Sequence, residues 1–140
     1  MKTILVTGGA GFIGSNFINH LLKKRRDCFV VNIDKLTYAG SLSYLSGVEG
    51  SDSYRFVKGD ICDARLMEQL MTEFEPDHIV NFAAESHVDR SISDPLIFVR
   101  SNVLGASILL DCACRHWSKT GYEGKSFVQV STDEVYGSID

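Results

Sequence analysis

The stretch Thr7-Gly8-Gly9-Ala10-Gly11-Phe12-Ile13-Gly14 decides the fold that we expect for this chain of 140 residues. It follows a short β-branched run, residues 3–7, and it leads into apolar residues at helical spacing from Phe12 to Leu22. Its glycines satisfy G-x-G-x-x-G through Gly9, Gly11 and Gly14, and G-x-x-G-x-x-G through Gly8, Gly11 and Gly14. Glycine is needed where a buried strand passes into a helix and the backbone must come close to a pyrophosphate, because the helix N-terminus then offers unpaired N–H groups to the anion. The stretch therefore predicts a phosphate-binding turn, in preference to a turn that merely requires glycine.

An acidic residue stands where such a turn would need one. Asp34 lies twenty positions beyond Gly14, at the end of a second predicted strand, residues 29–33. A carboxylate at this place accepts hydrogen bonds from the hydroxyls of the adenosine ribose and repels a 2′-phosphate. The spacing therefore predicts a dinucleotide site that takes NAD in preference to NADP.

The remaining chain continues the alternation of strands and helices. The patterns predict strands at 54–57, 78–83 and 126–131, and helices at 64–73 and from Asp94-Pro95 to Trp117, with proline at the favoured first helical position. Residues 35–53, rich in Ser, Gly and Tyr, form a predicted long functional loop with room for one short helix. Strands that alternate with helices indicate an α/β fold, a Rossmann-type doubly wound parallel sheet of at least five strands.

The helix after Pro95 has a wide apolar side. One row consists of Leu96, Val99, Val103, Ala106, Leu110, Ala113 and Trp117, and a second row adds Phe98, Ile108, Leu109 and Cys112. A stripe this wide is typical of a helix that is buried on two sides. Two arrangements fit it equally: burial between the sheet and a partner subunit, or full burial within one domain.

Composition excludes several classes of protein. With 44% hydrophobic and 23% charged residues the chain has an ordinary globular composition, which excludes a disordered tail. A net charge of −4 gives no electrostatic reason to bind nucleic acid, and the basic run at residues 23–26 is typical of a solvated helix end. No uninterrupted run of eighteen apolar residues predicts a membrane span, and the N-terminus lacks the long apolar region of a secretory signal. We therefore expect a soluble cytoplasmic protein.

The cysteines and histidines do not predict a metal site. Neither set has the spacing of metal ligands, and both are scattered along the chain: Cys28, Cys62, Cys112 and Cys114, and His20, His78, His87 and His116. We expect the cysteines to be reduced thiols that behave as small hydrophobic side chains.

Three further stretches carry a resemblance to a known family. They are residues 34–40 (DKLTYAG), 83–91 (AAESHVDRS) and 131–137 (STDEVYG). Together with the glycine turn they resemble the extended short-chain dehydrogenase/reductase family over essentially the whole chain, and within it the nucleotide-sugar 4,6-dehydratases that act on dTDP-glucose. The resemblance implies a lyase of deoxysugar biosynthesis that works as a homodimer. It also implies tightly bound NAD, which takes a hydride from C4 of the sugar and returns it at C6, giving the 4-keto-6-deoxy sugar.

In this resemblance the catalytic residues follow the fifth strand. Glu134 is similar to the base that removes the proton at C5, Asp133 to the acid that protonates the leaving C6 hydroxyl, and Thr132 to the residue that hydrogen-bonds the C4 oxygen. An elimination needs one base and one acid at neighbouring carbons, so two adjacent carboxyl groups suit the chemistry. Because neighbouring strand residues point to opposite faces, a bend must begin at Thr132 for both to reach one sugar. Without the resemblance, Asp133 and Glu134 would be assigned to a solvated loop.

The resemblance also implies which residues hold the two ligands. Predicted cofactor contacts are Gly8, Gly11, Phe12, Ile13 and Gly14 at the pyrophosphate, Asp34, Lys35, Leu36 and Thr37 at the adenosine ribose, Asp60 and Ile61 at the adenine, Ala83, Ala84, Glu85 and Ser86 at the nicotinamide, and Ser101, where the family usually has threonine. Predicted substrate contacts are His87, Thr132, Asp133 and Glu134.

The resemblance implies a catalytic tyrosine and lysine soon after residue 140, and residues 1–140 do not contain this pair. The family carries Tyr-x-x-x-Lys on a helix after the fifth strand, whereas Tyr54 and Lys58, which have this spacing, fall in a predicted strand and would be about 13 Å apart. We therefore expect residues 1–140 to be the cofactor-binding part of a longer protein, inactive without the Tyr-Lys helix and the substrate domain. The alternatives are an NAD-binding module without turnover and a related nucleotide-sugar epimerase or decarboxylase.

Overall fold

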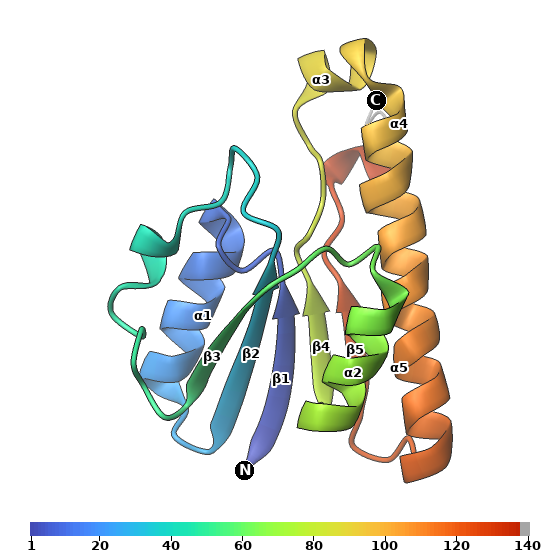
Figure 1. The fold of residues 1–140 in the computed structure, drawn as a ribbon. Coiled ribbons are helices and arrows are strands. Elements are labelled where there is room, and N and C mark those ends of the chain that lie inside the picture. The colour runs from blue at the N-terminus through green and yellow to red at the C-terminus, as the bar shows by residue number, and fades with distance from the viewer. Residues whose placement is uncertain (138–140) are drawn as a thin grey trace.

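Five parallel strands form one sheet, in the order β3-β2-β1-β4-β5 (Figure 1). The strands are β1 (Lys2–Thr7), β2 (Cys28–Asp34), β3 (Tyr54–Lys58), β4 (His78–Asn81) and β5 (Ser126–Gln129). The computed structural model describes residues 1–137, and for Asp133 and Glu134 it describes the backbone only. This strand order confirms the predicted Rossmann-type doubly wound sheet.

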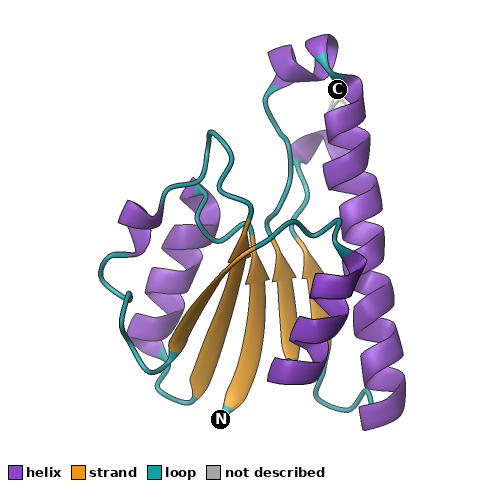
Figure 2. Cartoon of the chain, viewed as in Figure 1, coloured by secondary structure: helices purple, strands orange, loops and turns teal. Residues whose placement is uncertain are grey.

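Helices cover both faces of the sheet (Figure 2). Helix α1 (Phe12–Lys24) and the 3-10 helix η1 (Leu42–Leu45) lie on one face, and α2 (Ala64–Phe74) and α5 (Ala106–Thr120) lie on the other. Successive residues of a strand point to opposite faces. Leu5 of β1 therefore packs with the α2 and α5 side chains, whereas its neighbour Val6 packs with Ile18 of α1 and Leu45 of η1.

The strand order changes direction between β1 and β4, which pair from Ile4 and His78 to Thr7 and Asn81. The chain leaves the carboxyl end of β1 toward the α1 face and the carboxyl end of β4 toward the α5 face. The two connections separate there and open a crevice, which is the place where sheets of this kind bind ligands.

The long helical segment between β4 and β5 is not regular throughout. It consists of α4 (Pro95–Phe98), a π-helical segment η2 (Val99–Gly105) and α5. The predicted start at Pro95 is confirmed, but no apolar pattern in the sequence indicates the π turn. A Cβ on Gly105 would come within 2.6 Å of the Ile61 side chain, so glycine allows a close approach to the segment after β3.

Only one side of this segment is covered within residues 1–137. Leu109, Cys112, Ala113 and Trp117 are buried. Apolar residues nearer the start of the segment stay exposed by 45% to 75%: Leu96, Val99, Val103, Leu104 and Leu110. Full burial of the wide apolar side within one domain, one of the two arrangements that the sequence allows, is therefore not found in the described part of the chain.

The segment Pro95–Thr120 has the length and mean hydropathy of a membrane-spanning helix, although Arg100 and Asp111 interrupt its apolar residues. The criterion of an uninterrupted apolar run therefore missed this candidate. A core helix meets the same test of length and composition, and here the row from Leu109 to Trp117 packs on the sheet with Leu5 and Ile79.

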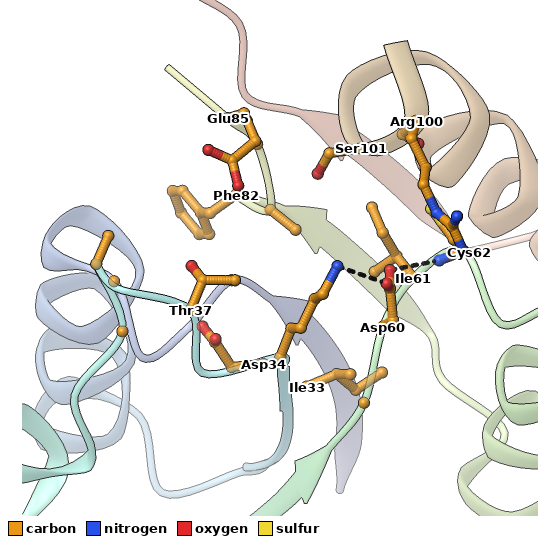
Figure 3. A pocket seen from close by; sticks show the side chains of 18 of the residues that line it. Ile33, Asp34, Thr37, Asp60, Ile61, Cys62, Phe82, Glu85, Arg100 and Ser101 are labelled. Atoms are coloured by element: carbon orange, nitrogen blue, oxygen red, sulfur yellow. Dashed lines mark hydrogen bonds and ion pairs between the residues drawn. The ribbon is translucent and has the colours of Figure 1, made fainter. Parts of the chain in front are cut away.

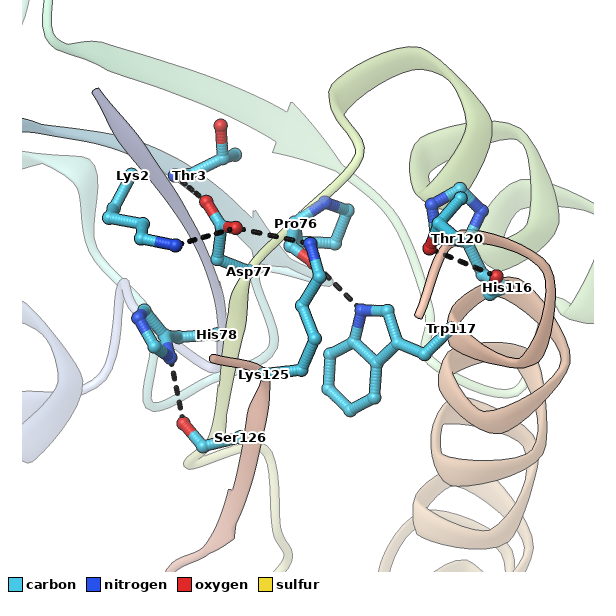
Figure 4. Close-up of polar contacts among 10 residues, drawn as sticks. All are labelled: Lys2, Thr3, Pro76, Asp77, His78, His116, Trp117, Thr120, Lys125 and Ser126. Atoms are coloured by element: carbon cyan, nitrogen blue, oxygen red, sulfur yellow. Dashed lines mark hydrogen bonds and ion pairs between the residues drawn. The ribbon is translucent and has the colours of Figure 1, made fainter. Parts of the chain in front are cut away.

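Polar contacts hold the amino end of the sheet (Figure 4). The Asp77 carboxylate accepts hydrogen bonds from the Thr3 N–H at 2.9 Å and from the Lys125 and Lys2 ammonium groups at 3.1 and 3.2 Å. Burial alone would raise the pKa of Asp77, but these hydrogen bonds outweigh it and hold that pKa at about 2. The Trp117 indole N–H donates to the carbonyl of the residue before Asp77 at 2.9 Å, so α5 is fixed to the same corner.

A row of polar side chains crosses three strands near their carboxyl ends; it is buried at β1 and β4 and exposed at β5. The Thr7 hydroxyl donates to the Asn81 side-chain oxygen, and the Asn81 amide donates to the Gln129 side-chain oxygen at 2.7 Å. Thr7 and Asn81 are fully buried. The row therefore joins β1, β4 and β5 where the crevice opens.

Two strands end earlier than predicted. β4 and β5 end at Asn81 and Gln129, two residues before the ends of the predicted strands 78–83 and 126–131. Beyond these points the backbone leaves the sheet and lines the crevice. Helix α3 (Val88–Ser93) was not predicted, because its apolar residues Val88 and Ile92 are exposed and form no buried stripe.

Candidate dinucleotide site

The glycine turn is so tight that three of its positions, Gly8, Gly9 and Gly14, have no room for a side chain; at Gly9 a Cβ would collide with the Asn32 side chain. Gly8 has a φ of +68°, and a Cβ there would lie 2.6 Å from the Ala83 backbone nitrogen. A Cβ on Gly14 would collide with the Gly8 carbonyl oxygen. The turn therefore holds the N-terminus of α1 against the crevice between β1 and β4.

Helix α1 begins with free backbone donors. Gly11 is its N-cap residue, and within residues 1–137 no side chain caps the helix and no acidic residue occupies its first turn. The first N–H groups of a helix have no partner inside it, so they form a site for an anion together with the helix dipole. Phe12 and Ile13 stand in this first turn and are largely exposed. This geometry suits an anion, and the assignment of these residues to a phosphate group stays a prediction.

The Asp34 carboxylate joins the glycine turn to the loop after β2. It accepts hydrogen bonds from the Ala10 N–H at 2.9 Å and from the Leu36 N–H at 2.8 Å. Leu36 has a φ of +56°, and its hydrogen bond to Asp34 stabilises this left-handed conformation. A carboxylate has about four acceptor positions, so Asp34 keeps positions free for the hydroxyls of a ribose.

One pocket collects most of the residues that the sequence assigns to the cofactor (Figure 3). Its lining includes the predicted residues Gly8, Gly11, Asp34, Lys35, Thr37, Asp60, Ile61, Ala83, Ala84, Glu85 and Ser101. The other predicted cofactor residues lie outside this lining: Phe12, Ile13 and Gly14 in the first turn of α1, Leu36 in the loop, and Ser86 at a neighbouring pocket. Segments that are far apart in the sequence therefore meet at the carboxyl ends of β1, β2, β3 and β4.

Several residues of the same lining were not predicted: Ile33, Ala39, Gly40, Gly59, Cys62, Phe82, Ile97 and Arg100. Most of them adjoin a predicted residue, as Cys62 adjoins Ile61, so position in the sequence was the available signal. Ile97 lies in α4 and Arg100 in the π-helical segment, and their approach to the pocket depends on how the long helix packs.

Lys35 and Asp60 form an ion pair at this pocket, with 2.8 Å between the ammonium nitrogen and a carboxylate oxygen. The other Asp60 oxygen accepts a hydrogen bond from the Cys62 N–H at 2.9 Å. Burial alone would raise the pKa of Asp60, but the hydrogen bonds from Lys35 and Cys62 lower it below its ordinary value. The Lys35 charge is therefore balanced by Asp60 and is not left free for a further phosphate group.

Asn102 fixes the wall of the pocket that follows β4. Its side-chain oxygen accepts a hydrogen bond from the Glu85 N–H, and its amide donates to the Glu85 carbonyl, both at 2.8 Å. Asn102 lies in the π-helical segment, and such irregular helical turns are frequent at functional sites. The π turn therefore presents the side chain that holds this wall in place.

A second pocket adjoins the first on the β5 side. Ala83, Ala84 and Glu85 belong to both linings, and the second also contains Ser86, residues of the long helix, and Thr132 after β5. The backbone then turns into the 3-10 helix η3 (Asp133–Tyr136), so the bend expected after Thr132 is present. The Asp133 and Glu134 side chains lie outside the described part of the structure. His87, predicted to approach the substrate, is an exposed N-cap residue of α3 outside both linings.

Three features together define the class of this protein: the strand order, the glycine turn at its switch point and the acidic residue at the end of β2. They are those of a Rossmann-type dinucleotide-binding domain of the short-chain dehydrogenase/reductase kind. More specifically, the chain belongs to the family described as GDP-mannose 4,6 dehydratase, whose model matches residues 5–140.

Comparison with individual proteins shows which members of the family this chain resembles. The dTDP-glucose 4,6-dehydratase of Salmonella typhimurium is 48% identical over 139 residues, which cover 97% of this chain and 38% of that protein. The structure of DesIV, the dTDP-glucose 4,6-dehydratase of Streptomyces venezuelae, solved with NAD bound, matches with a TM-score of 0.86 at 46% identity, over 99% of this chain and 42% of that one. A UDP-glucose 4-epimerase of Thermotoga maritima matches with a TM-score of 0.81 at 28% identity, over 99% of this chain and 41% of that one. The chain is thus similar to the N-terminal portion of dTDP-glucose 4,6-dehydratases and spans 38% to 42% of the length of these relatives.

Proposed function

We propose that this chain is the NAD-binding part of a dTDP-glucose 4,6-dehydratase. The observation that carries the proposal is the pair of adjoining pockets. The first runs from the glycine turn to Glu85, and the second reaches Thr132, where the chain turns toward Asp133 and Glu134. An epimerase would also need the first pocket, whereas an adjacent acid and base suit an elimination.

The residues of the first pocket fit NAD. The close packing of Gly8 on the segment after β4, and of Gly14 on Gly8, sets the start of α1 at the pocket, where its free N–H groups would face the charge of a pyrophosphate. Asp34 has acceptor positions left for the ribose hydroxyls. NAD bound here would take a hydride from C4 of the sugar and return it at C6.

Each of the three residues after β5 has one task in the proposed reaction. The Thr132 hydroxyl donates a hydrogen bond to the C4 oxygen, and Glu134 removes the C5 proton, which the C4 carbonyl makes acidic. Asp133 gives a proton to the C6 hydroxyl, which leaves as water while a double bond forms between C5 and C6. Glu134 then returns its proton to C5 as C6 is reduced, so the 4-keto-6-deoxy sugar is formed without net oxidation or reduction.

We also place this activity in a longer, cytoplasmic protein that works as a homodimer. The relatives are more than twice as long as this chain, so the Tyr-Lys helix and the substrate domain would come from outside residues 1–140. The exposed apolar row of Leu96, Val99, Val103 and Leu110 suits a second copy packed on the long helix. Val103→Glu should then shift the full-length protein from dimer to monomer in sedimentation, and an unchanged dimer would contradict this interface.

The function is tested on the full-length protein with NAD and dTDP-glucose. We expect a 4-keto-6-deoxy product, and a loss of about 10²–10⁴-fold in rate when either carboxyl group is replaced. In deuterated water Glu134→Gln should exchange the C5 proton slowly, whereas Asp133→Asn should keep that exchange while water is lost slowly. Exchange at the wild-type rate in Glu134→Gln would show that Glu134 is not the base.

A second candidate is an NAD-binding module without turnover. The short span of this chain relative to its relatives favours it for residues 1–140 taken alone. NAD binding without product in the full-length protein would support this candidate. Inversion at C4 of a nucleotide sugar without loss of water would instead support an epimerase.

A further inference from the structure

Arg90, in α3, contacts two segments that form opposite walls of the cofactor pocket. Its guanidinium carbon lies 4.3 Å from the centre of the Tyr38 ring, and a guanidinium nitrogen lies 3.6 Å from a Glu85 carboxylate oxygen. Tyr38 stands between Thr37 and Ala39, which line the pocket on the β2 side, whereas Glu85 lines it on the β4 side. The contacts from Glu85 through Arg90 to Tyr38 therefore join one wall to the other.

One end of this bridge is held firmly. The Glu85 backbone is hydrogen-bonded in both directions by Asn102, and the Glu85 side chain is only 10% exposed. Arg90 is partly exposed and is oriented by this carboxylate. Tyr38, at 62% exposed, belongs to the loop after Asp34. The bridge thus connects a fixed wall to an exposed loop.

We propose that the contact between Tyr38 and Arg90 is a latch over the cofactor pocket, which slows dissociation of the bound dinucleotide. The latch rests on the NAD site of the proposed function. The proposal requires that a dinucleotide between the two walls leaves on the side that the bridge joins, so that the contact breaks first. In a reaction that uses one cofactor molecule twice, such retention limits loss of the reduced form before its hydride has been returned to C6.

The expected effect is small and measurable. A guanidinium over an aromatic ring at an exposed site contributes about 0.5–1 kcal/mol, which corresponds to about 2- to 5-fold in a rate constant. Tyr38→Leu removes the ring but keeps an apolar side chain, so the dinucleotide should dissociate about 2- to 5-fold faster. Tyr38→Phe keeps the ring and should dissociate at nearly the wild-type rate, and Tyr38→Trp, with the best face for a cation, should be no faster than wild type.

The measurement uses the full-length protein loaded with NADH and chased with excess NAD, with the fluorescence of bound NADH as the readout. Tyr44→Leu is the matched control, because Tyr44 is another exposed tyrosine, in η1 outside the pocket lining. Arg90→Gln should accelerate release as much as Tyr38→Leu does. The double variant of Tyr38→Leu and Arg90→Gln should release no faster than either single variant, since both remove the same contact.

The outcomes separate the latch from the function on which it rests. Equal release rates for Tyr38→Leu and the wild type, or an equal acceleration in Tyr38→Phe, would overturn the latch while leaving the NAD site intact. Additive acceleration in the double variant would also overturn it. Failure of the wild-type protein to bind NADH would reject the proposed function and the latch with it.

Discussion

Replacement of Asp34 by asparagine should both destabilise the fold and remove the expected preference for NAD. The carboxylate accepts hydrogen bonds from the Ala10 and Leu36 N–H groups at 2.9 and 2.8 Å. An asparagine side chain has one oxygen, and its NH₂ group would face one of these two donors. A hydrogen bond to a charged group contributes about 1.5–3 kcal/mol, so the free energy of unfolding should fall by about that amount.

The effect on cofactor choice follows from charge. Two unit charges about 4 Å apart repel by about 4 kcal/mol at an effective dielectric constant near 20, and a 2′-phosphate beside Asp34 would meet repulsion of this order. Lys35 does not offset it, because that ammonium group is already paired with Asp60 at 2.8 Å. Even half of this repulsion corresponds to roughly 30-fold weaker binding of NADP. In Asp34→Asn the two cofactors should bind within about tenfold of each other.

Calorimetric titration of both cofactors into the full-length protein, with thermal unfolding of the same samples, measures the two effects. Asp63→Asn is the control, because the Asp63 carboxylate also accepts a backbone hydrogen bond, from Leu66 at 3.0 Å, but at the N-cap of α2 outside the pocket lining. Asparagine caps helices as well as aspartate does, so this variant should change neither cofactor preference nor stability much. Equal affinity of the wild-type protein for NAD and NADP would refute the role of Asp34.

Three further changes have defined outcomes. Gly8→Ala should lower both the melting temperature and NAD affinity, because a side chain at a φ of +68° costs about 1–2 kcal/mol and its Cβ would displace the segment after β4; unchanged values would contradict the close approach. Because the pKa of Asp77 is about 2 in the fold and higher in the unfolded chain, about 1–2 kcal/mol of stability should be lost as the pH falls from about 4 toward 2. Asp77→Asn should abolish this loss in acid unfolding curves, whereas Asp27→Asn should not, because its cationic partner is two residues away and within reach in the unfolded chain as well. Asn102→Ala should reduce the free energy of NAD binding by more than it reduces the free energy of unfolding. A larger loss in the free energy of unfolding would show that the role of Asn102 is only structural.

The elements that sequence patterns predict well are those that bury apolar residues at regular spacing. Helix α2 is an example, because Met67, Leu70 and Met71 are buried at the helical repeat. The π turn has no such signal, because no apolar pattern marks it, and the close approach of its Gly105 to Ile61 joins two residues that are far apart in the sequence. Helix α3 has no buried stripe and could not be predicted for the same physical reason.

Within the candidate site, too, the residues on regular elements were predicted better than those in loops and irregular turns. Residues at the ends of predicted strands, such as Asp34 and Ala83, meet in one pocket because parallel strands bring their carboxyl ends to one edge of the sheet. Leu36 and His87 lie in loop segments, where no periodicity indicates the direction of a side chain, and both fall outside that lining. The two hydrogen bonds between the Asn102 side chain and the Glu85 backbone were not predicted, because Asn102 lies in the π-helical segment, which the sequence does not indicate.

The row of Thr7, Asn81 and Gln129, buried at Thr7 and Asn81, also restricts the ways in which the strands can align. A slip of one residue between neighbouring strands turns every side chain to the opposite face, which would leave hydroxyl and amide groups without partners in an apolar interior. Each such group costs about 1–3 kcal/mol, so misaligned forms of β4 and β5 are disfavoured already during folding. The spacing between the glycine turn and the first residues after β5 is thereby fixed by the folding of the sheet itself, before any ligand is bound.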